Sequence, residues 1–201
     1  MKAKLYISTL ILWIVIVFTY YLFGYPEQFP LGDVLTQQVE WKELLSIYFI
    51  LILIVTLLSY SLYKNVSFSK KLFTSITCIN VFLMILMLSY GGYRFYNNRK
   101  ALNVEIVSFQ NEAYQDIKKD QIKVFGVGLA LPSRNKNEMD KFEKRDSIEK
   151  KYGLVKVSYC TISESLEICK TEYRKITEPY LEKRNGKGWR EKMENEIESI
   201  K

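Results

Sequence analysis

The stretch LLSIYFILILIVTLLSYSLY, residues 44–63, decides the fold because it holds no charged side chain over a length that crosses a bilayer. The apolar core of a bilayer is about 30 Å thick, and a helix of about 20 residues spans it. Thirteen of these residues are Leu, Ile, Val or Phe. Each of them favours insertion by about 0.3 to 0.6 kcal/mol. The stretch therefore predicts a transmembrane helix.

Residues 5–23 and 72–93 are two further uncharged stretches of sufficient length. A buried helix of a soluble protein would carry polar residues on one face at helical spacing, and none of the three stretches has such a face. Residues 1–93 contain 6 Lys and Arg with 4 Asp and Glu, whereas residues 94–201 contain 23 and 18. We therefore expect a membrane region of three helices in residues 1–93 and a small water-soluble α+β domain in residues 94–201.

The first apolar stretch resembles a signal peptide in one respect, since Lys2 and Lys4 precede it. Its length of 19 residues and the bulky residues around Tyr20 and Tyr25 disfavour cleavage, because a cleavage site needs small residues. We expect this segment to remain as an uncleaved anchor.

The charges of the two short connections predict the orientation, because cytoplasmic loops collect Lys and Arg. Residues 24–43 contain four acids and one Lys, whereas residues 64–71 contain three Lys and no acid. The amino terminus and residues 64–71 are therefore expected in the cytoplasm, with residues 94–201 exported, although Arg94, Arg99 and Lys100 oppose this orientation. The excess of Lys over Arg and the many Ile residues suggest an AT-rich genome, so we expect a multi-pass protein of a bacterial inner membrane, with its domain periplasmic or extracellular.

The second half of the chain predicts about two strands and three to four helices. The third apolar helix is expected to continue to about Ile117. The expected later elements are strand 122–131, helix 135–152, strand 154–162, a helix that begins after Ser163, and a short last helix from Trp189. Pro179 is expected to kink or stop the helix that begins after Ser163, because proline removes a backbone donor.

The absence of histidine from the sequence excludes His-dependent nucleophiles and His-ligated zinc. Three cysteines cannot assemble a four-cysteine metal site. The pair Gly126 and Gly128 lies inside an apolar run that ends in proline, which is not the setting of a phosphate-binding loop. We therefore expect no metal site and no cofactor, and the sequence identifies no catalytic residue.

Cys160 and Cys169 are expected to form a disulfide, because one ends a predicted strand and the other lies two turns into the next helix, on its apolar stripe. An exported domain would meet the oxidising conditions in which such a bridge persists. The alternative is two reduced cysteines that fill space in the core.

Asn80 is the notable polar residue inside the apolar stretches, since a buried amide in lipid requires a hydrogen-bond partner. It is expected to join the third helix to the other two, or to a second copy of the chain in a homo-oligomer. Because these stretches contain no Asp, Glu, Lys, Arg or His, an ion or proton pathway is disfavoured.

The charges of residues 94–201 alternate in sign, as in the run KFEKRDSIEKK at 141–151, which indicates a solvated helix face. We therefore expect no nucleic-acid partner, and the expected partners are the lipid bilayer and a protein on the exported side. The leading hypothesis is a non-enzymatic, membrane-anchored binding protein, either an immunity-type protein or an accessory subunit of an envelope complex. The alternatives are a membrane enzyme that acts on lipid or cell wall with carboxylate, Tyr or Lys groups, and a pore-forming or membrane-disrupting factor.

Overall fold

The computed structural model covers residues 1–201 and describes all of them except 1, 28, 62–66, 129–135, 160–161 and 201. The chain divides into two compact units, Met1–Lys100 and Ala101–Lys201. The described structure is mostly helical, with one small sheet. The two units are described separately below.

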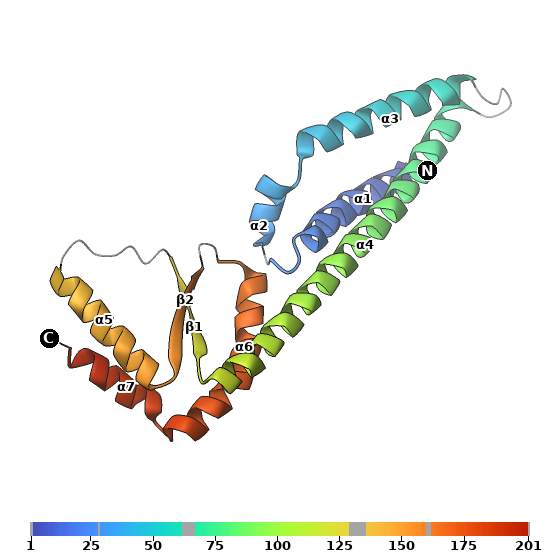
Figure 1. Ribbon diagram of the computed structural model, residues 1–201. Helices are drawn as coiled ribbons and strands as arrows, with labels where there is room; N and C mark the ends of the chain where they lie inside the picture. The colour runs from blue at the N-terminus through green and yellow to red at the C-terminus, as the bar shows by residue number, and fades with distance from the viewer. Residues whose placement is uncertain (1, 28, 62–66, 129–135, 160–161, 201) are drawn as a thin grey trace. The chain divides into compact units, whose positions relative to one another are not determined.

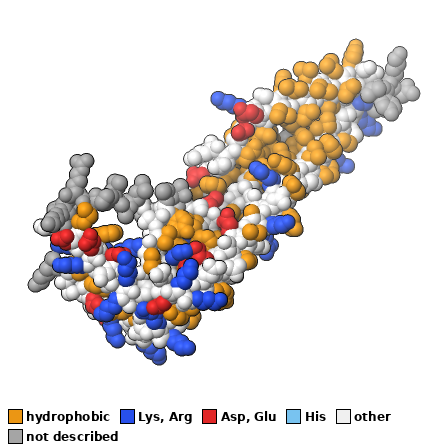
Figure 2. Space-filling view, viewed as in Figure 1, with side chains coloured by type: hydrophobic (Ala, Val, Ile, Leu, Met, Phe, Trp, Pro, Cys, Tyr) orange, Lys and Arg blue, Asp and Glu red, His pale blue; other side chains and the backbone are white. Residues whose placement is uncertain are grey.

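Three long apolar helices dominate the first unit: α1 at Lys2–Phe23, α3 at Trp41–Ser61 and α4 at Phe68–Lys119, of which α4 continues into the second unit (Figure 1). Each is long and apolar enough to cross a membrane. Large apolar side chains point outward from them, as Figure 2 shows, and Ile14 and Leu57 are 60% and 63% exposed. A water-soluble bundle would bury such side chains, so this outward apolar surface is typical of helices surrounded by lipid.

The connection between α1 and α3 folds back against α1. It forms the short helix α2 at Leu31–Asp33 and the π-helical turn η1 at Val34–Gln38. Val34 and Val39 are buried against Leu12 and Ile16 in the middle of α1. The connection therefore supplies apolar packing that its three acidic residues do not predict.

The second unit contains a two-stranded parallel sheet (Figure 1). Strand β1 runs from Ile122 to Val127, and β2 from Leu154 to Tyr159. Ile122 pairs with Leu154 and Val127 with Tyr159. Parallel strands require a crossover connection, and here the helix α5, Lys136–Lys151, lies between the two strands in the sequence.

Helices α6, Glu164–Asn185, and α7, Trp189–Glu198, complete the second unit. Ser163 begins α6 as its N-cap, since its hydroxyl accepts a hydrogen bond from the Leu166 N–H at 3.2 Å. The buried core joins the end of α4, both strands and the last two helices: Ala113, Ile122, Tyr152, Leu154, Tyr173, Leu181 and Trp189.

The predicted order of elements after the third apolar helix is confirmed: strand, helix, strand, helix, helix. Both strands end earlier than predicted, at Val127 and Tyr159, and residues 129–131 and 160–161 of the predicted strands lie outside the described residues. Pro179 does not stop α6, because the helix continues to Asn185 and buries Leu181 beyond the proline.

Candidate functional site

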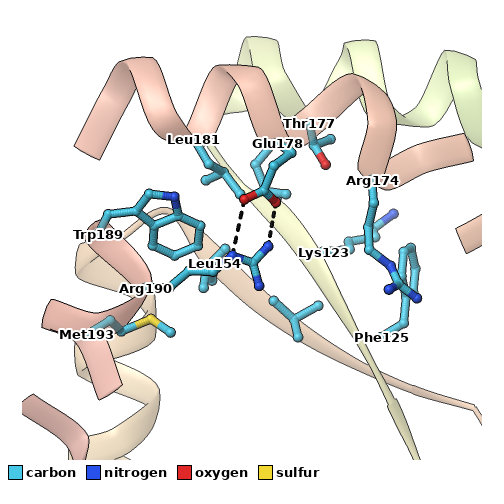
Figure 3. Close-up of a pocket in the computed structure, with 12 residues that line it drawn as sticks. Lys123, Phe125, Leu154, Arg174, Thr177, Glu178, Leu181, Trp189, Arg190 and Met193 are labelled. Carbon is cyan, nitrogen blue, oxygen red and sulfur yellow. Dashed lines mark hydrogen bonds and ion pairs between the residues drawn. The ribbon is translucent and has the colours of Figure 1, made fainter. Parts of the chain in front are cut away.

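A groove in the second unit lies beside strand β1, between this strand, α6 and α7 (Figure 3). Its volume is about 270 Å³. The residues that line it come from four elements: Ile122, Lys123, Val124 and Phe125 from β1, Leu154 from β2, Arg174, Thr177, Glu178 and Leu181 from α6, and Trp189, Arg190 and Met193 from α7. The lining is therefore apolar, with a few charged groups.

Four charged side chains line the groove: Lys123 on β1, Arg174 and Glu178 on α6, and Arg190 on α7. Figure 3 shows the Arg190 guanidinium directed at the Glu178 carboxylate, with Nε and Oε1 3.1 Å apart. The hydrogen bond that Arg190 donates to Glu178 raises the pKa of Arg190 and keeps it charged. Arg174 is 58% exposed by its side chain and lies 3.6 Å from Glu167. Among the residues that line the groove, three are cationic (Lys123, Arg174 and Arg190) and one is acidic (Glu178), which leaves the lining with a positive bias.

Strand β1 presents a free backbone edge along the groove. The N–H groups of Ile122 and Gly128 donate to the carbonyls of Gly153 and Tyr159, so the even-numbered residues face β2. The backbone groups of the odd-numbered residues therefore face away from the sheet. No third strand pairs with β1 among the residues that the structure describes.

One position of this edge is already occupied by a side chain. The Lys123 N–H donates to the Tyr173 hydroxyl at 2.9 Å, and this hydroxyl donates to the Asp116 carboxylate at 2.9 Å. Tyr173 is fully buried. Its phenol therefore takes the place of a neighbouring strand at Lys123, and the next outward-facing backbone position is Phe125.

Glu112, Asp116, Lys123 and Tyr173 form a polar cluster beside β1 that is structural rather than catalytic. Burial, with the Asp116 charge, raises the pKa of Tyr173 above its usual range. Burial lowers the pKa of the Lys123 ammonium, but the hydrogen bond to Glu112 and the charge of Asp116 outweigh it and leave the pKa raised. Both groups therefore stay protonated near neutral pH, and neither can serve as a general base there.

The structure describes one of the two cysteines of the predicted disulfide, Cys169. Cys169 is 1% exposed, and burial raises the pKa of its thiol, which makes the reduced form a poor nucleophile. Cys160 lies outside the described residues. The bridge between them stays a prediction.

Asn80 lies at the centre of the first unit and is fully buried. Its Nδ2 donates to the hydroxyls of Ser8 and Thr9 on α1, at 3.1 and 3.0 Å. Its Oδ1 accepts from the Tyr48 hydroxyl on α3 at 3.1 Å. The amide therefore connects α4 with both other long helices of this unit.

Sequence patterns did not identify the groove. The apolar positions Trp189 and Met193 indicate an amphipathic helix, but they do not indicate which surface the helix packs against. Within the described part of the chain no cluster of three or more Cys, Asp or Glu side chains could hold a metal ion. No known protein family, curated protein or solved structure matches this chain.

Proposed function

We propose that this protein is a non-enzymatic, membrane-anchored binding protein whose second unit docks a segment of another protein along β1. The three long helices are the anchor, with the amino terminus in the cytoplasm and the second unit exported from a bacterial inner membrane. An immunity-type role and an accessory role in an envelope complex are the two forms of this function.

The free edge of β1 beside an apolar groove is the observation that carries the proposal. An extended peptide can add to such an edge through main-chain hydrogen bonds, while its side chains enter adjacent pockets. The outward backbone groups of Phe125 supply the main-chain contact. The Trp189 ring and Met193 supply an apolar wall for a side chain of the partner.

The charges of the groove indicate the chemistry of the partner segment. Arg174 lies on its rim, and the Glu178 charge is matched by Arg190. A segment with one large apolar side chain and a neighbouring carboxylate therefore complements this surface better than a basic segment does.

Two features of the groove favour docking over catalysis. Its volume of about 270 Å³ lies below the range of about 300 to 1,000 Å³ of small-molecule pockets. Glu178 is the only acidic residue among those that line it, and its charge is neutralised by Arg190. A carboxylate-based enzyme would require an unpaired acid and base facing a substrate.

Site-specific photocrosslinking in living cells tests the proposal. A photoreactive amino acid at Val124, which is 39% exposed and lines the groove, should capture one discrete protein. The same probe at Tyr114, which is 56% exposed on α4 and does not line the groove, is the control. Equal patterns from the two positions would contradict docking at β1.

A charge reversal then tests the chemistry of the partner. Arg174→Glu should reduce the crosslink at Val124, because it places a carboxylate at the rim. Lys175→Glu is the matched control: it makes the same charge change at the next residue, which is 65% exposed by its side chain and does not line the groove. An equal reduction by both variants would indicate a general charge effect and would contradict the assigned surface.

A further inference from the structure

A second groove lies within the first unit, between α1 and the connection that folds back on it. Its volume is about 850 Å³. Trp13, Val17 and Tyr21 of α1 form one wall, and Leu31, Leu35 and Trp41 contribute to the other. Every residue that lines it is apolar or aromatic, and none carries a charge.

The groove exists because α3 begins beside the middle of α1. The Trp41 ring at the start of α3 lies 5.7 Å from the Trp13 ring, centroid to centroid, and the Trp41 indole donates to the Leu35 carbonyl. From Trp13 to Tyr21, about 12 Å of helix at 1.5 Å per residue, the short connection takes the place of α3. A connection of two short helical turns cannot cover α1 as fully as a long helix, and a hollow remains.

The depth of this hollow identifies its occupant. Trp13 to Tyr21 lie within the candidate span of α1, so the hollow opens onto the acyl chains of a bilayer once the anchor is inserted. An extended polypeptide would carry unsatisfied backbone groups into it, which a bilayer does not tolerate. A partner helix would contact the hollow over about two turns only. A hydrocarbon chain fills such an apolar space without any polar group to satisfy.

The polar residues of the connection indicate the headgroup. Asp33 and Glu40 are exposed and lie next in sequence to the wall residues Val34 and Trp41, and the exposed Lys42 follows Trp41, so two carboxylates stand against one ammonium beside the groove. These carboxylates repel a headgroup with net negative charge and tolerate a zwitterionic one. We propose that this groove holds one acyl chain of a zwitterionic phospholipid as a site of retained lipid, an inference that rests on the proposed membrane anchoring.

The test is mass spectrometry of the intact full chain, released in mild detergent from vesicles that contain equal amounts of phosphatidylcholine and phosphatidylglycerol. The expected result is one retained phosphatidylcholine per chain. Val17→Phe should abolish most of this retention, since the larger ring takes the space of the acyl chain and removes its van der Waals contacts with the groove. Val81→Phe is the matched control: it adds the same bulk at an outward position of α4, 47% exposed, that does not line the groove.

A second pair of variants tests the same groove in case Val17→Phe does not fold. Leu31→Trp fills the groove from the connection, and Leu57→Trp makes the same change on α3, outside the groove. The two leucines are 64% and 63% exposed, so the pair is matched in exposure as well. Leu31→Trp alone should release the lipid.

Resistance of the chain to alkaline carbonate extraction separates the two proposals. If the chain resists extraction but retains no lipid, retains phosphatidylglycerol in preference, or responds equally to both members of each pair, the lipid site is wrong and the anchor stands. If carbonate extracts the chain, the anchor and the lipid site are both wrong.

Discussion

Removing one hydroxyl by Tyr173→Phe should destabilise the second unit. The Tyr173 hydroxyl accepts from the Lys123 N–H and donates to Asp116, which is 5% exposed. Its loss leaves a partly buried N–H and a buried carboxylate each without this partner. An unsatisfied buried group costs about 1 to 3 kcal/mol. Because Asp116 keeps its contact with Lys123 at 3.5 Å, we expect a total loss of about 2 to 3 kcal/mol.

Hydrogen exchange of the full chain in detergent measures this loss locally. Amides of β1 should exchange at least about 30-fold faster in Tyr173→Phe, since about 1.4 kcal/mol is a factor of ten. Tyr180→Phe is the matched control, because the Tyr180 hydroxyl donates to an exposed carboxylate, that of Asp120, at 2.8 Å. Equal effects of the two variants, or no effect on β1, would refute the role assigned to Tyr173.

The raised pKa of the Tyr173 hydroxyl predicts that the second unit loses stability at high pH. Burial holds the pKa of Tyr173 above the ordinary value of 10.0, so the folded state retains a proton that the unfolded state loses. Stability from this group is complete below pH 10 and falls as the pH rises further. Tyr173→Phe should remove this part of the alkaline dependence, measured as β1 exchange corrected for intrinsic rates between pH 8 and pH 11.

Three further predictions concern other parts of the chain. Asn80→Leu should destabilise the first unit by about 1 to 2 kcal/mol, measured by unfolding in detergent, because it removes three hydrogen bonds of about 0.6 kcal/mol each. The control Thr74→Leu, on the exposed side of α4, should have little effect. The hydrogen bond from Arg184 lowers the pKa of Asp120, so the stability that this pair contributes is present above pH 3.8 and is lost as the pH falls further. Asp120→Asn should reduce this dependence of the unfolding free energy on pH, measured by urea titration. Labelling of whole cells with a membrane-impermeant thiol reagent should modify Cys160 or Cys169 only after reduction. Labelling of either without reduction would contradict the bridge, and labelling after reduction that appears only once the cells are permeabilised would contradict export.

Local patterns in the sequence predict most of the helices and both strands, because each depends on apolar spacing or on an adjacent cap. The Ser163 cap and the turn at Gly153, whose φ is +79°, are examples. The fold-back of Val34 and Val39 was not predictable in this way. It depends on their burial against α1, and the neighbouring charges Asp33 and Glu40 make the segment resemble an ordinary loop.

The groove beside β1 was not predictable for a related reason. A free strand edge results from which strands pair, and pairing is a contact between distant segments. The Tyr173 hydroxyl bond to Lys123 spans 50 residues, and no spacing rule connects these two positions. Asn80 differs, because a lone amide within an apolar helix predicts a buried polar contact even when its partners are unknown.

The Asn80 amide also determines how the first unit responds to membranes of different thickness. Hydrogen bonds to Ser8, Thr9 and Tyr48 fix the height of α4 relative to α1 and α3. Sliding one helix by a single turn, about 5.4 Å, would break all the bonds across that pair. In a thinner or thicker bilayer these helices must therefore tilt together, or deform the surrounding lipid, instead of moving past one another.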